Sequence, residues 1–530
     1  MTTSRLAGFV ACALLALVAA CSGAGPRDAP VEPGPDASTG TFDGSHVAFV
    51  QLFEWPWPDI ARECEDHLGP RGFTAVQISP PNEHAWITTG DGAPFPWWMR
   101  YQPVSYRLES RSGTRDQLAD MIARCKAVGV AIYADVVINH MAAGSGSQSS
   151  AGASPWGNKK YPAVPYDAAS FHPTCAITNY QDANNVQGCE LSGLPDLDTR
   201  KPDVRRKLAD YLLELTSLGV AGFRVDAAKH IYPADLAAIV DDVNARAETR
   251  PFWFLEVIGA GGEAVQPAQY FGLSGGDVTV TEFGYGARLH NAFVTSALAD
   301  LRTFGETGLL PSNHAVAFTD NHDKQRGHGG GGGYLTYHRG ASYQLANVFM
   351  LAWPYGYPVV MSSYAFETAT ASDTSYGPPF DPTAGSATGA TQGPWASGSV
   401  ACGDQVRGGW VCEHRFAAIA GMIGFRAATM TRWQVTDWWD NGAGQIAFGR
   451  GDRGFVAINH EAEALTRSFH TSLAAGAYCD VLSGALSAGA ADGAAPACSG
   501  TVVTVDAQGN ASLTVPAFGA VAIHKNAVIL

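Results

Sequence analysis

The sequence is poor in charged residues and has no excess of positive charge. Asp, Glu, Lys and Arg make up 16% of the 530 residues, and 34 Lys and Arg stand against 49 Asp and Glu, which gives a formal net charge of −15. A nucleic-acid backbone requires a basic surface, so this balance excludes nucleic acid as a partner. Apolar residues make up 46% of the chain, a globular proportion that excludes a disordered polypeptide.

The sequence also lacks a hydrophobic run at its N-terminus that is long enough to span a membrane. The apolar run Leu6–Ala20 falls short of the roughly 18 residues that a spanning helix needs. Because Arg5 precedes this run and small residues lead into Cys21, we predict a lipoprotein-type signal over residues 1–21, with Cys21 lipidated. Ordinary secretory cleavage nearby is the alternative.

Residues 22–45 are rich in Gly, Pro, Ser and Asp, and they predict a disordered tether. Together with the signal, this tether predicts an extracellular or cell-surface protein, exported by a bacterium and held by a lipid anchor. Contact with a membrane would then occur only through Cys21.

The cysteines include no CxxC pair of the kind that zinc sites use. Eight of the ten lie outside the signal, and an even number in an exported chain favours disulfide bonds. Eight cysteines allow 105 connectivities, but three close local couples within apparent loops leave one further pair. The predicted disulfides are Cys175–Cys189, Cys402–Cys412, Cys479–Cys498 and, from the remaining two cysteines, Cys64–Cys125.

From residue 46 the chain alternates apolar segments with amphipathic ones of helical period, as in parallel βα units. Eight such units predict a closed (β/α)8 TIM barrel, whose chemistry lies at the carboxyl ends of the strands. Two helices are predicted over Thr114–Val128, which starts with a capping box, and over Pro202–Leu218. The predicted strands are His46–Phe53, Phe73–Ser79, Val130–Ile138, Val220–Val225, Phe252–Val257, Val278–Phe283, Ala315–Thr319 and Tyr357–Met361.

Two further regions depart from the barrel pattern. About sixty residues rich in Gly, Ser, Asn and Pro follow the third predicted strand, which is too many for an ordinary loop. We therefore predict an inserted domain over residues 141–200, within a barrel formed by 46–140 and 201–430. Short alternating runs after the amphipathic segment Cys412–Ala428 predict an antiparallel β-sandwich over 431–530. Its predicted strands are Gln445–Gly449, Gly454–Asn459, Ser468–Leu473, Thr501–Val505, Ala511–Val515 and Ala520–His524.

Three acidic residues, Asp226, Glu256 and Asp323, stand at the ends of predicted strands. A carboxylate at the end of an apolar strand is costly to desolvate without a partner or a task. On one face of a barrel the three would converge, and two carboxyl groups that flank a glycosidic bond can carry out a double displacement. Each acid alone could be a helix N-cap, but three together, with the polar neighbours Arg224 and His322, favour a catalytic site.

Several motifs resemble the α-amylases of glycoside hydrolase family 13, and the resemblance runs from about residue 46 to the C-terminus. Three other segments resemble the animal-type branch of that family in particular. The first set is Gln51–Trp55, Pro96–Tyr106, Asp135–His140, Gly222–His230 and Phe318–Asp323. The second set is Gly69–Phe73, Asn321–Gly329 and Val360–Tyr364.

This resemblance implies that Asp226 is the nucleophile, that Glu256 is the general acid/base, and that Asp323 binds sugar hydroxyls and helps to distort the ring. Arg224 would orient Asp226 and keep it ionised, because a neighbouring guanidinium favours the charged form. Glu256 lies in the apolar run Phe252–Val257, an environment that favours a protonated acid.

The resemblance also implies a set of side chains that contact the sugar. Histidines would donate to hydroxyls beside the cleaved bond, aromatic rings would stack on pyranose faces, and His328 would lie in a glycine-rich loop that closes over substrate. The implied set is Trp97, Trp98, Tyr101, Gln102, His140, Arg224, Lys229, His230, His322 and His328.

Two ions enter through the same resemblance. Calcium prefers six to eight oxygen ligands, and the family's positions match the side chains of Asn139 and Asp196 and the backbone carbonyls of Gln187 and His230. The animal-type branch holds chloride with two arginines and an asparagine. Arg224 and Asn321 match that set, but Val359 replaces the second arginine, and we therefore expect weak chloride binding or none.

The sequence thus predicts an endo-acting α-amylase, a monomer that cleaves internal α-1,4 bonds of starch, glycogen and maltodextrins with retention. One alternative is a retaining α-glucosidase or transglycosylase of the same clan, which would share the three acids and differ in its loops. Another is a non-catalytic carbohydrate-binding scaffold, which the loss of a carboxylate would indicate. All three carboxylates are present.

Overall fold

The computed structural model describes residues 46–529 except 277, 330–332, 368–373, 381–388 and 488–495. The predicted signal, Cys21 and the tether over 22–45 lie outside the described residues. Among the helices that are described, none is both long and apolar enough to cross a bilayer.

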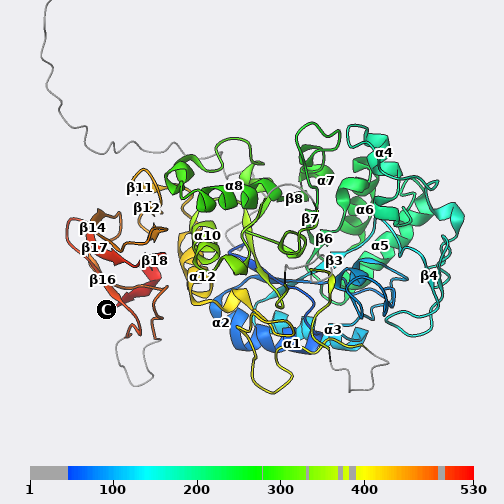
Figure 1. The fold of residues 1–530 in the computed structure, drawn as a ribbon, viewed down its shortest axis with the longest axis horizontal. Helices are drawn as coiled ribbons and strands as arrows, with labels where there is room; N and C mark the ends of the chain where they lie inside the picture. Colours follow the sequence, from blue (N-terminus) through cyan, green and yellow to red (C-terminus); the bar gives the residue numbers. More distant parts are fainter. Residues whose placement is uncertain are drawn as a thin grey trace, which may run out of the picture.

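Eight parallel strands close into a barrel at the centre of the molecule, in the order β1-β10-β9-β8-β7-β6-β3-β2 (Figure 1). Each lies within one of the predicted segments, apart from the last residue of β10. The barrel strands are β1 (Phe49–Leu52), β2 (Ala75–Ile78), β3 (Ala131–Val136), β6 (Gly222–Val225), β7 (Phe252–Leu255), β8 (Val278–Glu282), β9 (Ala315–Phe318) and β10 (Tyr357–Ser362). The TIM-barrel prediction is therefore confirmed.

Aromatic side chains of the barrel strands pack against one another inside the barrel. Rings of Phe49, Tyr133, Phe254 and Tyr357 contact one another and fill one end of the barrel, with centroid separations of 4.7 to 6.4 Å. This end is a packed core, which leaves the other end for polar groups.

The helices between the strands cover the outside of the barrel. The predicted capping box is present at α3, where Thr114 accepts from the Gln117 amide and the Gln117 side chain accepts in return from the Thr114 amide. The helices are α1 (Trp57–Glu63), α2 (Gly69–Arg71), α3 (Arg115–Ala127), α5 (Pro202–Ser217), α6 (Pro233–Arg246), α7 (Leu273–Gly276), α8 (Phe283–Val294), α9 (His322–Gln325), α10 (Ala341–Ala352) and α12 (Ala417–Thr429).

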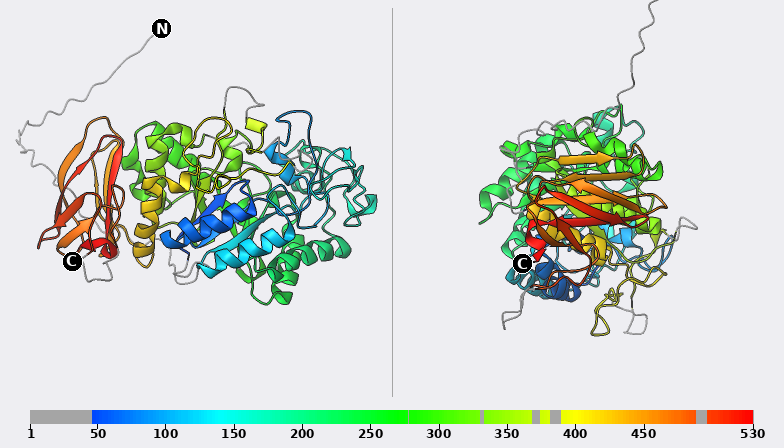
Figure 2. Two further views of the ribbon diagram at one scale, coloured as in Figure 1. Left: turned by 90° about the horizontal axis from the view of Figure 1, so that it is seen from below. Right: turned by 90° about the vertical axis from the view of Figure 1, so that its left-hand side faces the viewer.

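The segment after β3 forms the end of the molecule farthest from the C-terminal β domain (Figure 2). It contains little regular structure, as its composition predicts: β4 (Ser145–Gly146), β5 (Trp156–Gly157) and α4 (Ala183–Gly188). A backbone hydrogen bond from Met141 to Pro195 joins the two ends of this segment, and one from Leu197 to Asn139 joins it to the barrel.

The C-terminal region folds as two antiparallel sheets, with the orders β11-β12-β13-β18 and β14-β17-β16-β15-β19. Three of the strands, β11, β15 and β19, were not predicted, and β14 begins three residues before its predicted position. The strands are β11 (Thr436–Asp440), β12 (Gln445–Gly449), β13 (Gly454–Asn459), β14 (Leu465–His470), β15 (Gly476–Cys479), β16 (Val502–Val505), β17 (Asn510–Val515), β18 (Gly519–His524) and β19 (Val528–Ile529).

Four disulfides join the same cysteine pairs that the sequence predicts. Cys64–Cys125 links the start of the π-helical turn after α1 to α3, and Cys175–Cys189 closes a loop of the inserted segment. The other two are Cys402–Cys412 and Cys479–Cys498.

Candidate active site

The three predicted acids converge at the carboxyl ends of the barrel strands. The amide of Asp226 donates to the Val136 carbonyl and that of Glu256 to the Val225 carbonyl, so both residues extend the parallel ladder beyond β6 and β7. Asp323 lies in α9, the short helix that follows β9. All three line one cavity of about 780 Å³.

Arg224 on β6 binds three carboxylates at once. Its Nη1 atom lies 2.7 Å from Asp135 Oδ1 and 2.8 Å from Asp226 Oδ1, and its Nη2 atom lies 2.7 Å from Glu256 Oε1. The guanidinium is almost fully buried, so the contacts of Nη1 are charge-assisted hydrogen bonds in a site with little water, and the contact of Nη2 with Glu256 is an ion pair. Arg224 therefore fixes the spacing of the two principal carboxylates, Asp226 and Glu256.

Asp135, at the carboxyl end of β3, is part of this network although the sequence analysis assigned it no role. Its side chain is fully buried, and it accepts from Arg224 and from the hydroxyl of Tyr101 at 2.9 Å. The only available sequence signal was its position at the end of a strand, which it shares with the three predicted acids. Asp135 holds both Arg224 and the Tyr101 ring in place.

Burial raises the pKa of Asp226 and Asp323 in the cavity, and neighbouring negative charges add to the rise. Burial raises the pKa of Asp226 well above its usual range, and the charges of Glu256 and Asp135 add to the rise, whereas Arg224 opposes it. Burial and the charge of Glu256 raise the pKa of Asp323 to about 7. The sequence predicts that Arg224 keeps Asp226 ionised, but the cost of burying the Asp226 carboxylate outweighs the effect of the guanidinium.

A backbone feature after Asp226 orients Glu256. Ala227 has a φ of 49°, in the left-handed region that non-glycine residues rarely adopt. This conformation points its amide at the acid, and the Ala227 N–H donates to Glu256 Oε2 at 2.9 Å. Glu256 is thus fixed through one oxygen by a backbone amide and through the other by Arg224.

Two predicted histidines line the same cavity in the neutral form. Burial lowers the pKa of His140 to about 4 and that of His322 well below its usual range. His140 Nε2 lies 3.0 Å from the Tyr101 carbonyl, and the His322 ring stacks on Tyr101 with centroids 5.2 Å apart. Neutral imidazoles can each donate one hydrogen bond without adding charge to the carboxylate cluster.

The remaining predicted sugar contacts divide into two groups. Trp97, Trp98, Tyr101, Lys229 and His230 line the cavity. Gln102 and His328 are not among the lining residues. The Gln102 side-chain oxygen accepts from the Ala143 amide at 3.0 Å, and its contact with substrate stays a prediction. The His328 ring packs beside Trp97, with centroids 5.5 Å apart.

Lys229 is held by partners that the sequence analysis did not identify. Its ammonium group forms an ion pair with Glu263, donates to the Ile258 carbonyl at 2.7 Å and lies 4.9 Å from the centroid of the Tyr180 ring. Tyr180 comes from the inserted segment, so this wall of the cavity is built from two regions that are far apart in sequence.

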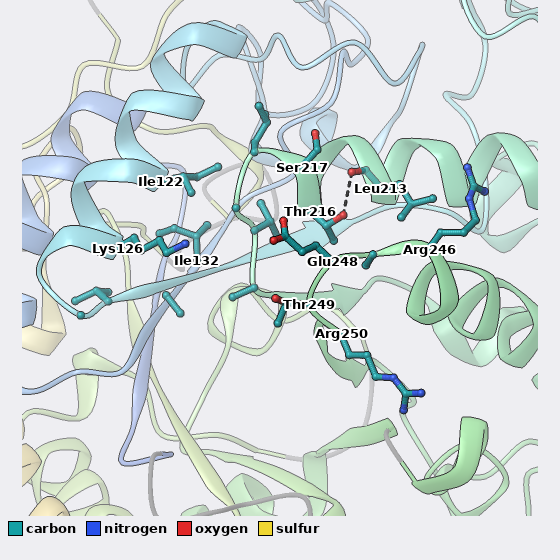
Figure 3. Close-up of a pocket in the computed structure, with 18 residues that line it drawn as sticks. Ile122, Lys126, Ile132, Leu213, Thr216, Ser217, Arg246, Glu248, Thr249 and Arg250 are labelled. Atoms are coloured by element: carbon teal, nitrogen blue, oxygen red, sulfur yellow. Dashed lines mark hydrogen bonds between the residues drawn. The ribbon is translucent and has the colours of Figure 1, made fainter.

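Another large cavity, of about 970 Å³, lies at the opposite end of the strands (Figure 3). Its wall includes the strand starts at Ala131 and Ala221 and the aliphatic side chains of Ile122 and Leu213. Among the residues that the structure describes, Glu248 is the only carboxylate that lines this cavity, so these residues cannot place two carboxyl groups around a bond. The chemistry therefore belongs to the cavity that holds Asp226 and Glu256.

Glu63, His67 and His414 form a cluster with metal-ligand side chains in the described part of the chain. The Glu63 carboxylate already accepts from His414 at 2.8 Å, from Arg415 at 2.6 and 2.7 Å, and from Trp395 at 3.0 Å. Because the guanidinium neutralises this carboxylate and its oxygens are saturated, the cluster is an internal network that joins α1 to the segment before α12.

Comparisons with known proteins match the whole of this architecture. Residues 76–251 match the α-amylase catalytic domain, and residues 436–526 match the α-amylase C-terminal all-β domain. The chain is 46% identical over 498 residues to an α-amylase of Tribolium castaneum, with coverage of 92% of this chain and 95% of the relative. It is 42% identical to pancreatic α-amylase 2a5 of Mus musculus, with coverage of 90% and 93%.

Solved structures agree with the sequence relatives. A structure of α-amylase I from Eisenia fetida has a TM-score of 0.80 and 38% identity, and the match covers 94% of this chain and 99% of that one. A glutamate-to-glutamine variant of the same amylase, solved as a complex with maltohexaose, matches with a TM-score of 0.79 and 38% identity over 93% and 99% of the two chains.

The relatives overturn one prediction. They are amylases of insects, a mollusc and mammals, and they point to secreted enzymes of eukaryotes rather than to a bacterial protein held by a lipid anchor. The small residues before Cys21 fit both a lipoprotein-type signal and a cleaved secretory signal, so this pattern does not distinguish the two. With relatives more than 40% identical over about nine-tenths of its length, the chain belongs to the α-amylase family of glycoside hydrolases and is an endo-acting α-amylase.

Proposed function

We propose that this chain cleaves internal α-1,4-glucosidic bonds of starch, glycogen and maltodextrins with retention, and that Asp226 is the nucleophile and Glu256 the general acid/base. One observation carries the assignment: both carboxylates are bound to the same guanidinium, that of Arg224, at 2.8 and 2.7 Å. This sharing favours the short separation of roughly 5–5.5 Å that retaining enzymes use over the 6.5–9.5 Å of inverting ones.

The reaction follows from these positions in two steps. Asp226 attacks the anomeric carbon, while Glu256 gives its proton to the glycosidic oxygen, so the leaving glucan departs with a hydroxyl group. Glu256 then removes a proton from water, which attacks the glycosyl-Asp226 ester and restores the original anomeric configuration. Asp323, which lines the same cavity, would bind hydroxyl groups of the distorted ring.

The neighbouring side chains would hold the glucan across the cavity. His322, which is neutral, would donate to a hydroxyl beside the cleaved bond, and Tyr101 would provide a flat surface there. The single N–H of the neutral His140 is donated to the Tyr101 carbonyl, so its ring would contact the sugar there without donating. Trp97 and Trp98 would stack on further rings. The remaining proposed contacts are Lys229 and His230 on the leaving side, and His328 at the glycine-rich segment.

Sizing of the products formed from soluble starch tests this proposal. An endo-acting enzyme releases a ladder of maltooligosaccharides and lowers viscosity before much reducing sugar appears. Release of glucose alone would favour the α-glucosidase alternative, and unchanged starch would favour a binding scaffold.

We also propose the division into a barrel (46–140 and 201–430), an inserted domain (141–200) and a β domain (431–530), all within a monomer.

A calcium ion fits the junction between the barrel and the inserted domain. Asn139 and Asp196 are 2% and 1% exposed, and the backbone bridge between His140 and Asp196 places them side by side. Burial raises the pKa of Asp196 to about 6, although His172, whose Nδ1 lies 2.6 Å from Asp196 Oδ2, opposes the rise. Their oxygens and the carbonyls of Gln187 and His230 form a donor set that a hard cation prefers.

Removal of calcium is therefore expected to lower thermal stability and activity together. The ligands join β3 to the inserted segment that carries Tyr180, so loss of the ion would loosen the wall of the cavity. A ligand that binds only the folded state at a hundred times its Kd stabilises it by about 2.7 kcal/mol. Melting curves in excess chelator and in millimolar calcium measure this effect. Identical melting temperatures would contradict the site.

The residues at the chloride position do not fit an anion. Val359 contributes no charge, and both terminal nitrogens of Arg224 already bind carboxylates. The Asn321 side-chain oxygen accepts from the Lys324 amide as the N-cap of α9. We expect a flat response when the enzyme is dialysed free of chloride and the salt is titrated back at constant ionic strength. A saturable activation of several-fold would show that Arg224 and an amide suffice.

A further inference from the structure

Lys324 places a buried cation behind the residues that line the catalytic cavity. It follows Asp323 directly in α9, and its side chain is 7% exposed. The ammonium nitrogen lies 5.2 Å from the ring centroids of both Phe283 and Tyr334. Two aromatic faces at this distance stabilise a cation that has lost part of its water, and they fix its position.

This pair of rings is itself rigid and belongs to the cavity. The hydroxyl of Tyr334 donates to the carbonyl of Phe283 at 2.6 Å, which holds the two rings in one arrangement. Both residues line the same cavity as Asp226 and Glu256. Gly329 also lies close to the ammonium group, since a Cβ atom added at Gly329 would be 3.3 Å from Lys324 Nζ.

The charged groups that act on Lys324 include two acids of the proposed reaction. Burial lowers the pKa of Lys324, and the negative charges of Asp323 and Glu256 oppose this shift. Conversely, Lys324 and Arg224 lower the pKa of Asp323, which burial and Glu256 raise. On β8, the carboxylate of Glu282 caps α8 by accepting from the Gly284 and Leu310 amides.

We propose that Lys324 is a positioning residue of the α-amylase site, whose ammonium group, fixed between Phe283 and Tyr334, adds a positive charge near Asp323 to that of Arg224 and sets the pH range of catalysis. This inference rests on the proposed roles of the catalytic acids. Arg224 is shared by three carboxylates, so a cation on the Asp323 side of the cavity balances charge that Arg224 does not neutralise.

The sign of the effect follows from the charge. A cation favours the ionised form of a nearby carboxyl group, so its removal makes the carboxylates bind protons more tightly. Both limbs of the profile of kcat/KM against pH should then move to higher pH. A residue with only a packing role would lower the rate or the stability and leave the positions of the limbs unchanged.

The test is the pH profile of kcat/KM on a maltooligosaccharide for the wild type, Lys324→Met and Lys324→Arg. We expect Lys324→Met to move both limbs upward by about half a pH unit or more, and Lys324→Arg to return them to the wild-type positions. Limb positions do not depend on how much of a preparation is folded. Should Lys324→Met fail to fold, Lys324→Gln removes the same charge and retains hydrogen bonding.

Lys207→Met is the matched control, because Lys207 also lies over a tyrosine ring, at 4.7 Å from the Tyr166 centroid, but that ring, unlike Phe283 and Tyr334, does not line the cavity. Its profile should match the wild type. Superimposed profiles for Lys324→Met and the wild type would overturn the inference, as would equal shifts for Lys324→Met and Lys324→Arg. Failure of the proposed function would be distinct from both, since the wild type would then release no sugar at any pH.

Discussion

Asp226→Asn is expected to reduce starch hydrolysis by about 10⁴-fold or more while folding and glucan binding persist. The amide keeps the shape of the side chain but cannot form the glycosyl-enzyme intermediate. Arg224 retains Asp135 and Glu256 as partners in this variant, so the network around the site should survive. The measurement is kcat on soluble starch, with the melting temperature and starch affinity recorded in parallel.

Asp241→Asn provides the control, since Asp241 is an exposed acid on α6 that does not line the cavity. It should retain wild-type turnover. If Asp226→Asn kept more than about a tenth of the wild-type rate, Asp226 could not be the nucleophile.

Glu256→Gln is expected to cause a loss that depends on the leaving group. A sugar alcohol needs a proton to depart, so hydrolysis of starch should fall by a factor on the order of 10³ or more. A glycoside with an acidic phenol as its leaving group needs no such proton, and its first step should remain fast. The glycosyl-enzyme should then accumulate, because no base remains to activate water.

Burst kinetics with the activated glycoside measure this accumulation. Added azide, which needs no base to attack, should restore turnover of Glu256→Gln and should not restore Asp226→Asn. Equal losses on starch and on the activated glycoside, without rescue by azide, would contradict the role of Glu256 as acid/base.

The sequence was sufficient to predict the barrel because local and global signals agree there. Each barrel strand is a short apolar run between helices, and the capping box at Thr114 marks the start of α3 as predicted. The sandwich was harder to predict, because its missed strands are short or irregular. In β11 the register shifts between Thr436 and Trp439, and the intervening Asp437 has a φ of 52°, so the alternation of side chains is broken.

The acids could be found from their positions, but their interactions could not. Asp135, Asp226 and Glu256 each follow or end an apolar strand, and nothing in their spacing shows that one guanidinium binds all three. The sequence did not indicate a role for Lys324, for a similar reason. Its partners Phe283 and Tyr334 are 41 and 10 residues away in sequence, and only the closed barrel brings both rings to its ammonium group.

The identity of the covalent intermediate tests the central claim most directly. The enzyme would be incubated with a maltosyl donor that has an activated leaving group and a fluorine substituent, and the fluorine slows the second step. The protein would then be digested and mapped by mass spectrometry. The account predicts one equivalent of sugar attached to the peptide that contains Asp226. A label on the peptide that contains Glu256, or turnover without any covalent label, would contradict it.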